Sequence, residues 1–483
     1  MHRSKKIWQL MLIVMVSALI IQFFIPHGLT RKAQPASCGE GCSRYDVVVI
    51  GSELQGMLLA KEAQDLGLSV LVIDPREKPG GELLQGEMLF LDEPFNKERK
   101  SLVQGEMKTL FKQYNKGKIR TLDDFTEYYN ELIEDIPMKS GIKIKAVQEA
   151  AAGGSNTLQS LQYTDQDQKE HKLEAGYWVE NTDFNALTGK LQHKKRIPGM
   201  EVVEKSNKPD YMGATYMLKY KNVDWKKLNK DVLKHYPLEN VRKVFGPNTY
   251  VDHNFAVGFS NIMAKYQPVE KLVRLRGLNI AYQGDGEVII NALIMYNIDP
   301  SSEASVNEAL RKGKVEAPRI LEFLRTHLGG FENAEMNGSP NYLYIRDFNR
   351  FETDYVLTFE DVMSSKMFWD NVSIGAYPVD LQGTVNIPHG IGFGTPDPYG
   401  IPLRSFLLKE YDNVIAVGKN IGADIKAYGT SRIMPNNALA AQCIGIILGY
   451  EADRKQLKDL TPEDFERIHR YLKRKFKIDV AGT

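Results

Sequence analysis

Residues Tyr45–Gly56, with the sequence YDVVVIGSELQG, begin the unit that decides the fold of this chain. The apolar, β-branched run up to Ile50 is typical of a buried parallel strand, and glycines bracket the turn that follows. Residues 57–66 contain helix formers with one apolar face, and a second apolar run, residues 69–73, ends at Asp74. The order strand, glycine turn, helix, strand and acid predicts an α/β domain of the Rossmann type.

Each residue type in this unit has a physical role in dinucleotide binding. Gly51 permits the tight turn, Gly56 lets the helix pack closely against the strand, and the helix N terminus, with Ser52, faces a pyrophosphate. Asp74 is placed to accept hydrogen bonds from an adenosine ribose. Glu53 replaces the middle glycine of the pattern, so its carboxylate repels a pyrophosphate unless it turns away, for instance towards a ribose. The alternative is an ordinary parallel βαβ unit with glycines in its turn.

The segments that follow resemble the FAD-dependent oxidoreductases with a glutathione-reductase-type nucleotide domain. The paired glycine Gly80–Gly81 comes soon after the ribose acid, as it does in that family. Residues 177–183 resemble the family's apolar strand that ends in Ala-Thr-Gly. Thr182 matches this pattern, whereas Asn181 and Asp183 replace the small residues. The two departures predict a different backbone arrangement near the pyrophosphate.

The C-terminal part of the chain carries the strongest resemblance. Residues 413–421, NVIAVGKNI, resemble the strand and turn that return the family's chain to FAD. Residues 427–435, AYGTSRIMP, resemble its Gly-Ser/Thr-x-Arg-Val-Met-Pro segment, and we expect residues 429–435 to be a turn before a helix over about 436–448. In the family this helix points its N terminus at the flavin pyrimidine edge, where a positive helix end stabilises negative charge. The resemblance implies FAD as the cofactor, held additionally by Gly81, Thr182, Gly418, Arg432, Pro435 and Asn436.

We therefore predict an α/β fold in which a Rossmann-like FAD-binding domain carries an inserted α+β substrate domain and follows one N-terminal transmembrane helix. Residues 346–358, 375–380 and 398–405 carry further matches to the family, whereas residues from about 195 to 330 match nothing specific. The predicted limits are 1–30 for a membrane anchor or signal sequence, 31–43 for a linker, 44–190 and 405–450 for the two parts of the FAD-binding domain, 191–404 for the substrate domain, and 451–483 for a helical tail.

Composition narrows the class of partner. Lys and Arg (62) nearly balance Asp and Glu (61), which leaves a net charge of +1. Nucleic-acid-binding domains usually carry a strong basic excess, so we expect no nucleic-acid partner. Hydrophobic residues (43%) and charged residues (25%) occur in ordinary proportions, which excludes a mainly disordered chain. Three cysteines are too few for a disulfide scaffold, and no Cys/His cluster has zinc spacing, so no metal site is predicted.

The N-terminal segment differs from the rest of the chain. Residues 7–25 contain no charge and would form a helix about 28 Å long, close to the roughly 30 Å hydrocarbon core of a bilayer. We see no good signal-peptidase site after it, so we favour a retained anchor over a cleaved signal, with secretion as the alternative. More basic charge precedes the run than follows it, which favours a single-pass protein with its body outside the cytoplasm. Cys38 and Cys42 either pair, if the body is exported, or remain free thiols.

Catalytic residues are hard to predict because a flavin performs the hydride transfer itself. His389 lies in a Gly/Pro-rich loop and is either a substrate-facing proton donor or a surface residue without a role. Arg404 and Arg432 offer planar donors for a phosphate or a substrate carboxylate, although structural ion pairs are equally common for Arg. Cys443 is expected to be a buried small hydrophobe.

The function predicted from these observations is that of an FAD-dependent oxidoreductase, tethered to a membrane, that acts on a small organic substrate. One alternative is a flavoprotein dehydrogenase that passes electrons to membrane quinone. Another is a non-catalytic binding protein that retains the nucleotide fold, an option that Glu53 and Asp183 keep open. The substrate, the electron acceptor and the oligomeric state are not readable from the sequence.

Overall fold

The strand–turn–helix–strand unit forms as the sequence predicts. In the computed structural model, which describes residues 33–152 and 154–481, the unit consists of β2 (Cys42–Ile50), α2 (Leu54–Asp65) and β3 (Val70–Asp74). Strand β2 is parallel to β3, and Val47–Ile50 are fully buried. The burial of this β-branched run on both faces of a sheet explains why it is continuously apolar.

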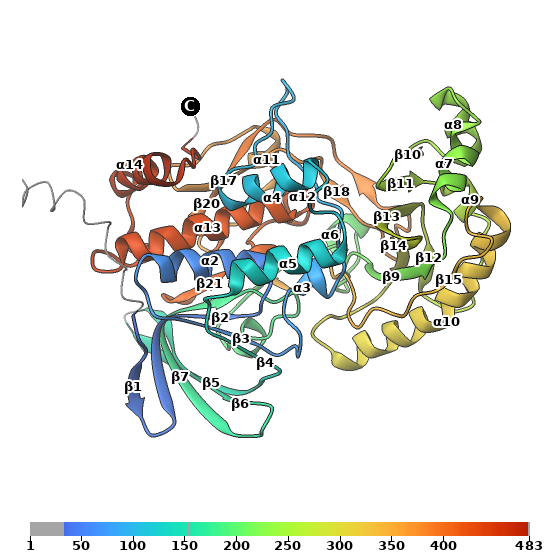
Figure 1. The fold of residues 1–483 in the computed structure, drawn as a ribbon. Coiled ribbons are helices and arrows are strands. Elements are labelled where there is room, and N and C mark those ends of the chain that lie inside the picture. The colour runs from blue at the N-terminus through green and yellow to red at the C-terminus, as the bar shows by residue number, and fades with distance from the viewer. Residues whose placement is uncertain (1–32, 153, 482–483) are drawn as a thin grey trace, which may run out of the picture.

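The first sheet is built around this unit. Strands β4 (Met138–Ser140), β3, β2 and β7 (Glu170–Glu180) lie in this order and are parallel. Strand β21 (Val414–Ala416) pairs in parallel with the end of β7, so the C-terminal part of the chain completes the sheet. An antiparallel meander of β5 (Lys143–Ala152), β6 (Ser155–Thr164) and β7 extends from it (Figure 1).

Part of the predicted linker 31–43 belongs to this sheet. Strand β1 (Ala36–Gly39) pairs antiparallel with the start of β2, and a disulfide joins Cys38 to Cys42. The structure thus selects the paired form of the two cysteines. Within the predicted linker, residues 36–39 thus form a hairpin with β2, which supplies partners for their backbone groups.

Helices cover one face of the first sheet (Figure 1). The long helix α13 (Met434–Glu451) packs against α2 so closely that a Cβ at Gly445 would lie 2.4 Å from the Leu59 carbonyl oxygen. Around this pair lie α4 (Gly105–Asn115), α5 (Leu122–Ile133) and α14 (Pro462–Tyr471). Helix α12 (Ile425–Ser431) extends into the segment expected to be a turn and takes in residues 429–431, and Asp424 caps its N terminus through the amides of Lys426 and Ala427.

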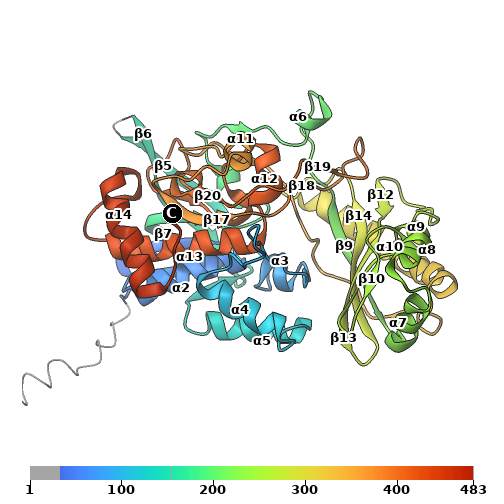
Figure 2. The same cartoon turned by 90° about the horizontal axis from the view of Figure 1, so that it is seen from above.

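A second lobe is built on a seven-stranded antiparallel sheet whose strands fall inside the predicted insertion (Figure 2). Its strands are β9 (Ala214–Lys221), β10 (Tyr250–Val251), β11 (Phe255–Gly258), β12 (Val273–Leu275), β13 (Leu278–Gly284), β14 (Glu287–Met295) and β15 (Glu335–Met336). Its helices are α7 (Trp225–Leu233), α8 (Leu238–Phe245), α9 (Ser260–Met263) and α10 (Glu303–His327). This lobe has its own hydrophobic core, formed by residues such as Leu218, Ile290 and Leu324.

Short elements connect the lobes and return the chain to the first sheet. They are α3 (Gly81–Leu84), β8 (Arg196–Ile197), α6 (Glu201–Glu204), β16 (Arg350–Phe351), α11 (Phe359–Met363), β17 (Asn371–Gly375), β18 (Asp380–Leu381), β19 (Ile391–Gly392) and β20 (Tyr399–Pro402). Single-turn segments lie at Thr188–Lys190, Leu403–Ser405, Gly418–Asn420, Leu457–Asp459 and Leu472–Phe476. In Figure 2, β18 and β19 lie between the two lobes.

The predicted membrane span, residues 7–25, lies outside the described residues. Among the residues that are described, no helix has the length and apolar character needed to cross a bilayer.

Candidate functional site

The two glycines of the nucleotide-type turn allow strand β7 to approach it. Gly51 has a φ of +99°, and a Cβ on it would lie 2.7 Å from Cγ2 of Thr182. A Cβ on Gly56 would lie 2.2 Å from Nδ2 of Asn181. Oδ1 of Asn181 accepts a hydrogen bond from the backbone amide of Gly56 at 3.0 Å, and Nδ2 of Asn181 donates one to the Glu53 carbonyl at 3.0 Å. Asn181, a departure from the family pattern, therefore braces the turn from the side of the sheet.

The N terminus of α2 carries buried donors without partners. The backbone amides of Glu53, Leu54 and Gln55 make no hydrogen bond within the described part of the chain, and no side chain caps the helix. All three residues are at most 3% exposed. Buried, uncapped amides at a helix N terminus suit an anion, as a diphosphate would be.

The Glu53 side chain lies beside these donors. Its carboxylate accepts hydrogen bonds from the Glu82 amide at 2.6 Å and from Nη1 of Arg76 at 2.7 Å. A Cβ on Gly81 would lie 1.8 Å from Oε2 of Glu53, so the carboxylate fills the space that the paired glycine leaves open. Burial raises the pKa of Glu53, and the charge of Arg76 opposes this rise.

The predicted ribose acid, Asp74, is fully buried and bonded within the protein. It accepts hydrogen bonds from the Ser52 amide at 2.7 Å and from the Ser52 hydroxyl at 2.5 Å. Nη2 and Nε of Arg76 donate to its two oxygens at 2.9 and 3.1 Å. Arg76 thus links Asp74 to Glu53, and the sequence analysis did not single it out.

Lys419 is a second buried cation that sequence reasoning missed. Its Nζ donates to Glu82 at 3.0 Å and to the Ile345 carbonyl at 2.5 Å, and lies 3.6 Å from Asp183. Burial alone would lower the pKa of Lys419, but Glu82 and Asp183 raise it above its ordinary value. The available signal was a lysine inside the apolar run NVIAVGKNI, because a buried lysine needs a carboxylate partner.

Four carboxylates and two cations therefore surround the N terminus of α2: Asp74, Glu53, Glu82 and Asp183 with Arg76 and Lys419. One oxygen of Asp183 is buried without a hydrogen-bond partner, and the other accepts a hydrogen bond from the Tyr342 hydroxyl. If the Glu53 carboxylate turned aside, the free amides of α2 and Nη1 of Arg76 would become available to a diphosphate, while Lys419 would stay bonded to Glu82 and to the Ile345 carbonyl.

The start of α13 forms the other end of the predicted cofactor site. The side-chain NH₂ groups of Asn436 and Asn437 donate hydrogen bonds to the carbonyls of Thr430 and Ser431, at 3.2 and 3.0 Å respectively. Oδ1 of each asparagine and Oγ of Ser431 are buried and have no hydrogen-bond partner among the residues that the structure describes. Since buried polar atoms are normally satisfied, this set fits the polar edge of a bound ring. Pro435 lies in the first turn of the helix, as predicted.

The remaining predicted residues lie in different surroundings. Thr182 is buried and bonded to Glu180, and Gly418 has a φ of +66° at the turn after β21. Arg432 is 8% exposed at the end of α12. His389 is exposed and bonded to Arg274 on the second lobe, at 2.7 Å. Arg404 forms an ion pair with Asp370, and Cys443 is buried, as expected.

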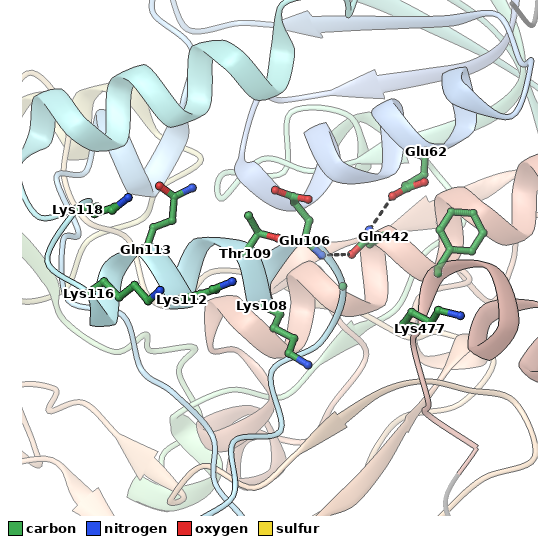
Figure 3. A pocket seen from close by; sticks show the side chains of 12 residues that line it. Glu62, Glu106, Lys108, Thr109, Lys112, Gln113, Lys116, Lys118, Gln442 and Lys477 are labelled. Atoms are coloured by element: carbon green, nitrogen blue, oxygen red, sulfur yellow. Dashed lines mark hydrogen bonds between the residues drawn. The ribbon is translucent and has the colours of Figure 1, made fainter. Parts of the chain in front are cut away.

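Two of the clefts among the described residues bear on the extent of this site. One, of about 850 Å³, is lined by Glu62, Gln442 and five lysines, of which Lys108 and Lys112 lie on α4, and contains none of the predicted residues (Figure 3). The other, of about 490 Å³, is lined by Arg76, Gln85 and Tyr342 among others, and so reaches the edge of the ion network around Glu53.

Comparison with protein families decides the class of this fold. The family model described as FAD dependent oxidoreductase matches residues 46–472, which is most of the chain. The chain belongs to this family. Membership in the FAD dependent oxidoreductases confirms the predicted cofactor, FAD, and the predicted class of enzyme. No curated protein sequence matches the chain.

Solved structures with a similar fold are remote in sequence. A geranylgeranyl bacteriochlorophyll reductase-like protein from Thermoplasma acidophilum is 11% identical, with a TM-score of 0.39 over 90% of this chain and 84% of that one. A flavoprotein/dehydrogenase from Cytophaga hutchinsonii is 10% identical, with a TM-score of 0.40 over 89% and 83%. The myxobacterial chondrochloren halogenase, an FAD-dependent halogenase, is 12% identical, with a TM-score of 0.37 over 90% and 80%. These similarities are too low to support an argument about activity.

Proposed function

We propose that this FAD-dependent oxidoreductase oxidises or reduces a small organic substrate at the start of α13, on the side that faces the second lobe. The observation that carries the proposal is the set of buried, unpartnered polar atoms of Ser431, Asn436 and Asn437. Leaving such atoms unsatisfied costs about 1–3 kcal/mol each, so a polar ligand is expected to pair with them.

FAD supplies the hydride-transfer chemistry when bound. The turn from Gly51 to Gly56, with Arg76 and Lys419, would hold its diphosphate, and the start of α13 would hold its ring. No side chain caps the N terminus of α13, so the positive end of the helix dipole would orient the cofactor's ring edge and favour negative charge on it. The tightly packed residues around α2 and α13 exclude water from this end of the site.

We also propose that residues 7–25 anchor the protein in a membrane with the body outside the cytoplasm. The supporting observations are the uncharged run of sufficient length and the excess of basic residues before it. Secretion after cleavage of this segment is the alternative outcome of the fractionation experiment described below.

The experiment that tests the activity is a flavin assay on the full chain, purified in detergent. We expect bound FAD, visible from its absorbance bands, and bleaching of these bands by a substrate in the absence of oxygen. Asn437→Ala should weaken FAD binding, because it removes one of the unpartnered oxygens.

Gln442→Ala on the same helix is the matched control, because its amide bonds to Glu62 and to the Glu106 amide in the lysine-lined cleft (Figure 3). A folded but colourless protein that does not take up added FAD would refute the proposal.

A further inference from the structure

We infer that the boundary between the two lobes holds a binding site for the oxyanion group of a substrate, a carboxylate or a phosphate, formed by Arg276, Arg346 and Arg432. This inference rests on the proposed function only in that it places the oxyanion next to the start of α13.

Two of the three arginines share one amide. Nη2 of Arg276 and Nη2 of Arg346 donate to the same oxygen, Oδ1 of Asn291 on β14, at 3.1 and 3.2 Å. The other terminal nitrogen of Arg346 donates to the Gly213 carbonyl at 3.0 Å and to the Thr215 hydroxyl at 2.7 Å. All of these acceptors are neutral, and they hold the two guanidinium groups side by side at the surface of the second sheet.

The third arginine comes from the first lobe. Arg432 ends α12 and donates to the Asp380 carbonyl at 3.3 Å. Its charge and that of Arg276 both act to lower the pKa of Arg346, after the larger effect of burial, to about 9. The three side chains are therefore close enough to repel one another, although they belong to elements far apart in the sequence.

Within the described part of the chain, no carboxylate accepts a hydrogen bond from any of these three guanidinium groups. The nearest ion-pair partner is Asp380, whose carboxylate is 3.9 Å from Arg432 and 53% exposed. Asp92 also faces Arg432 and Arg346, but it accepts its hydrogen bond from the Tyr377 hydroxyl, at 3.3 Å, and burial raises its pKa. Buried guanidinium groups without a paired anion are costly, which indicates that an anion belongs in the site.

Two donor atoms remain available within the cluster. Nε of Arg276 and Nε of Arg432 are buried, and neither has a hydrogen-bond partner in the described chain. Arg432 is 8% exposed and Arg346 is 4% exposed. Arginine presents a planar fork of donors that matches carboxylate and phosphate groups, so the unused nitrogens identify the chemistry of the missing ligand.

The position of the cluster connects it to the rest of the site. Arg432 directly follows Ser431, one of the residues with an unpartnered oxygen near the start of α13. Arg276 follows β12, and Asn291 lies on β14, so the second lobe supplies the opposite wall. An oxyanion bound by the three arginines would hold the rest of a small molecule between the second sheet and the first turn of α13.

The test uses the full chain in detergent, and binding is titrated by calorimetry in the presence and absence of FAD. The oxyanion probes are benzoate, succinate and inorganic phosphate. Benzamide has the shape of benzoate without its charge and is the neutral control. We expect at least one oxyanion to bind and benzamide not to bind. Benzoate or succinate without phosphate would identify a carboxylate site, and phosphate alone would identify a phosphate site.

Arg276→Gln should weaken oxyanion binding by roughly tenfold or more, because a charge-assisted hydrogen bond is lost, and Arg276→Lys should restore part of it. Arg274→Gln is the matched control, because Arg274 is two residues away and is bonded to the Pro388 carbonyl and to His389 instead. Equal binding of benzoate and benzamide, or unchanged binding in a folded Arg276→Gln protein, would overturn the inference.

These results are separable from those for the proposed function. A yellow protein that is bleached by neutral substrates and binds none of the oxyanions would overturn the arginine site and leave the oxidoreductase proposal intact. A colourless protein that binds an oxyanion through Arg276 would overturn the oxidoreductase proposal and leave the arginine site intact.

Discussion

Replacing Glu53 with glycine should strengthen FAD binding while it weakens the FAD-free fold. In the described structure the Glu53 carboxylate bonds to the Glu82 amide and to Arg76, next to the free amides of α2. A diphosphate that uses these amides must displace the carboxylate or lie beside it. Two like charges about 4 Å apart repel by about 4 kcal/mol at an effective dielectric constant of 20, and the cations Arg76 and Lys419 reduce this value.

We therefore expect Glu53→Gly to lower the FAD dissociation constant by about 5- to 1,000-fold, which corresponds to about 1–4 kcal/mol. Without FAD, the same change should cost about 1–3 kcal/mol of stability, because the Glu82 amide loses its acceptor. Arg76 keeps its partner Asp74 in this protein, so the fold should survive.

The sign of the pH dependence follows from the raised pKa of Glu53. Protonation removes the like charge, so FAD should bind more tightly as the pH falls through that pKa. Glu53→Gln, which keeps the size of the side chain, should remove this part of the pH dependence. The charges of Asp183, Arg76 and Lys419 are the same in the unmodified protein and in Glu53→Gln, so the difference between the two pH profiles reports on Glu53.

The measurements are a titration of FAD by fluorescence quenching at several pH values and the thermal midpoint of the FAD-free protein. Weaker or unchanged FAD binding in a folded Glu53→Gly protein would refute the view that this carboxylate competes with the diphosphate.

Three further predictions concern the turn, the N terminus and the start of α13. Any side chain at position 56 would clash with Asn181. Gly56→Val should therefore release FAD and destabilise the protein, and Gly56→Ala should lower the free energy of unfolding by about 1–3 kcal/mol. Adding Asn181→Ala should cost less stability in Gly56→Ala than in the unmodified protein, because it relieves the clash while it removes the hydrogen bonds to the turn, and full flavin content in Gly56→Val would contradict the assignment. If residues 7–25 are a retained span, the native protein should stay with membranes after a carbonate wash, whereas a chain beginning between residues 27 and 40 in the medium would indicate cleavage. Pro435→Gly combined with Asn436→Asp should lower the flavin midpoint potential by tens of millivolts, since a helix terminus contributes up to about 2 kcal/mol and roughly 30 mV corresponds to 1.4 kcal/mol. A raised or unchanged potential with FAD bound would place this helix away from the ring.

The nucleotide-type unit was predictable because its signals are local. The apolar run before Ile50, the glycines of the turn and the second apolar run each follow from the needs of a parallel strand and a close helix. The same reasoning predicted the helix after Pro435. It expected a turn over residues that form α12, because the capping residue, Asp424, lies outside the segment that carries the resemblance.

The ion network around α2 could be anticipated only in part. Glu53 and Asp183 were recognisable as departures from the family pattern. Their partners were not, because Lys419 reaches Asp183 from the turn after β21, and no local pattern reports such a pairing. Similarly, Arg276 lies in a region that matches nothing specific, and only the folded sheet brings it beside Arg346.

Strand β21 is synthesised after most of the chain, and this order affects folding during translation. The edge of β7 that β21 covers, and the face of α2 that α13 covers, receive their partners only when residues 414–451 have been synthesised. The second lobe has its own core and all of its strands by residue 336. A growing chain can therefore finish its inserted lobe while the first sheet still exposes an unpaired strand edge and an apolar helix face. In a chain that ends before residue 414, that strand edge and that helix face lack their partners, and such surfaces are prone to aggregation.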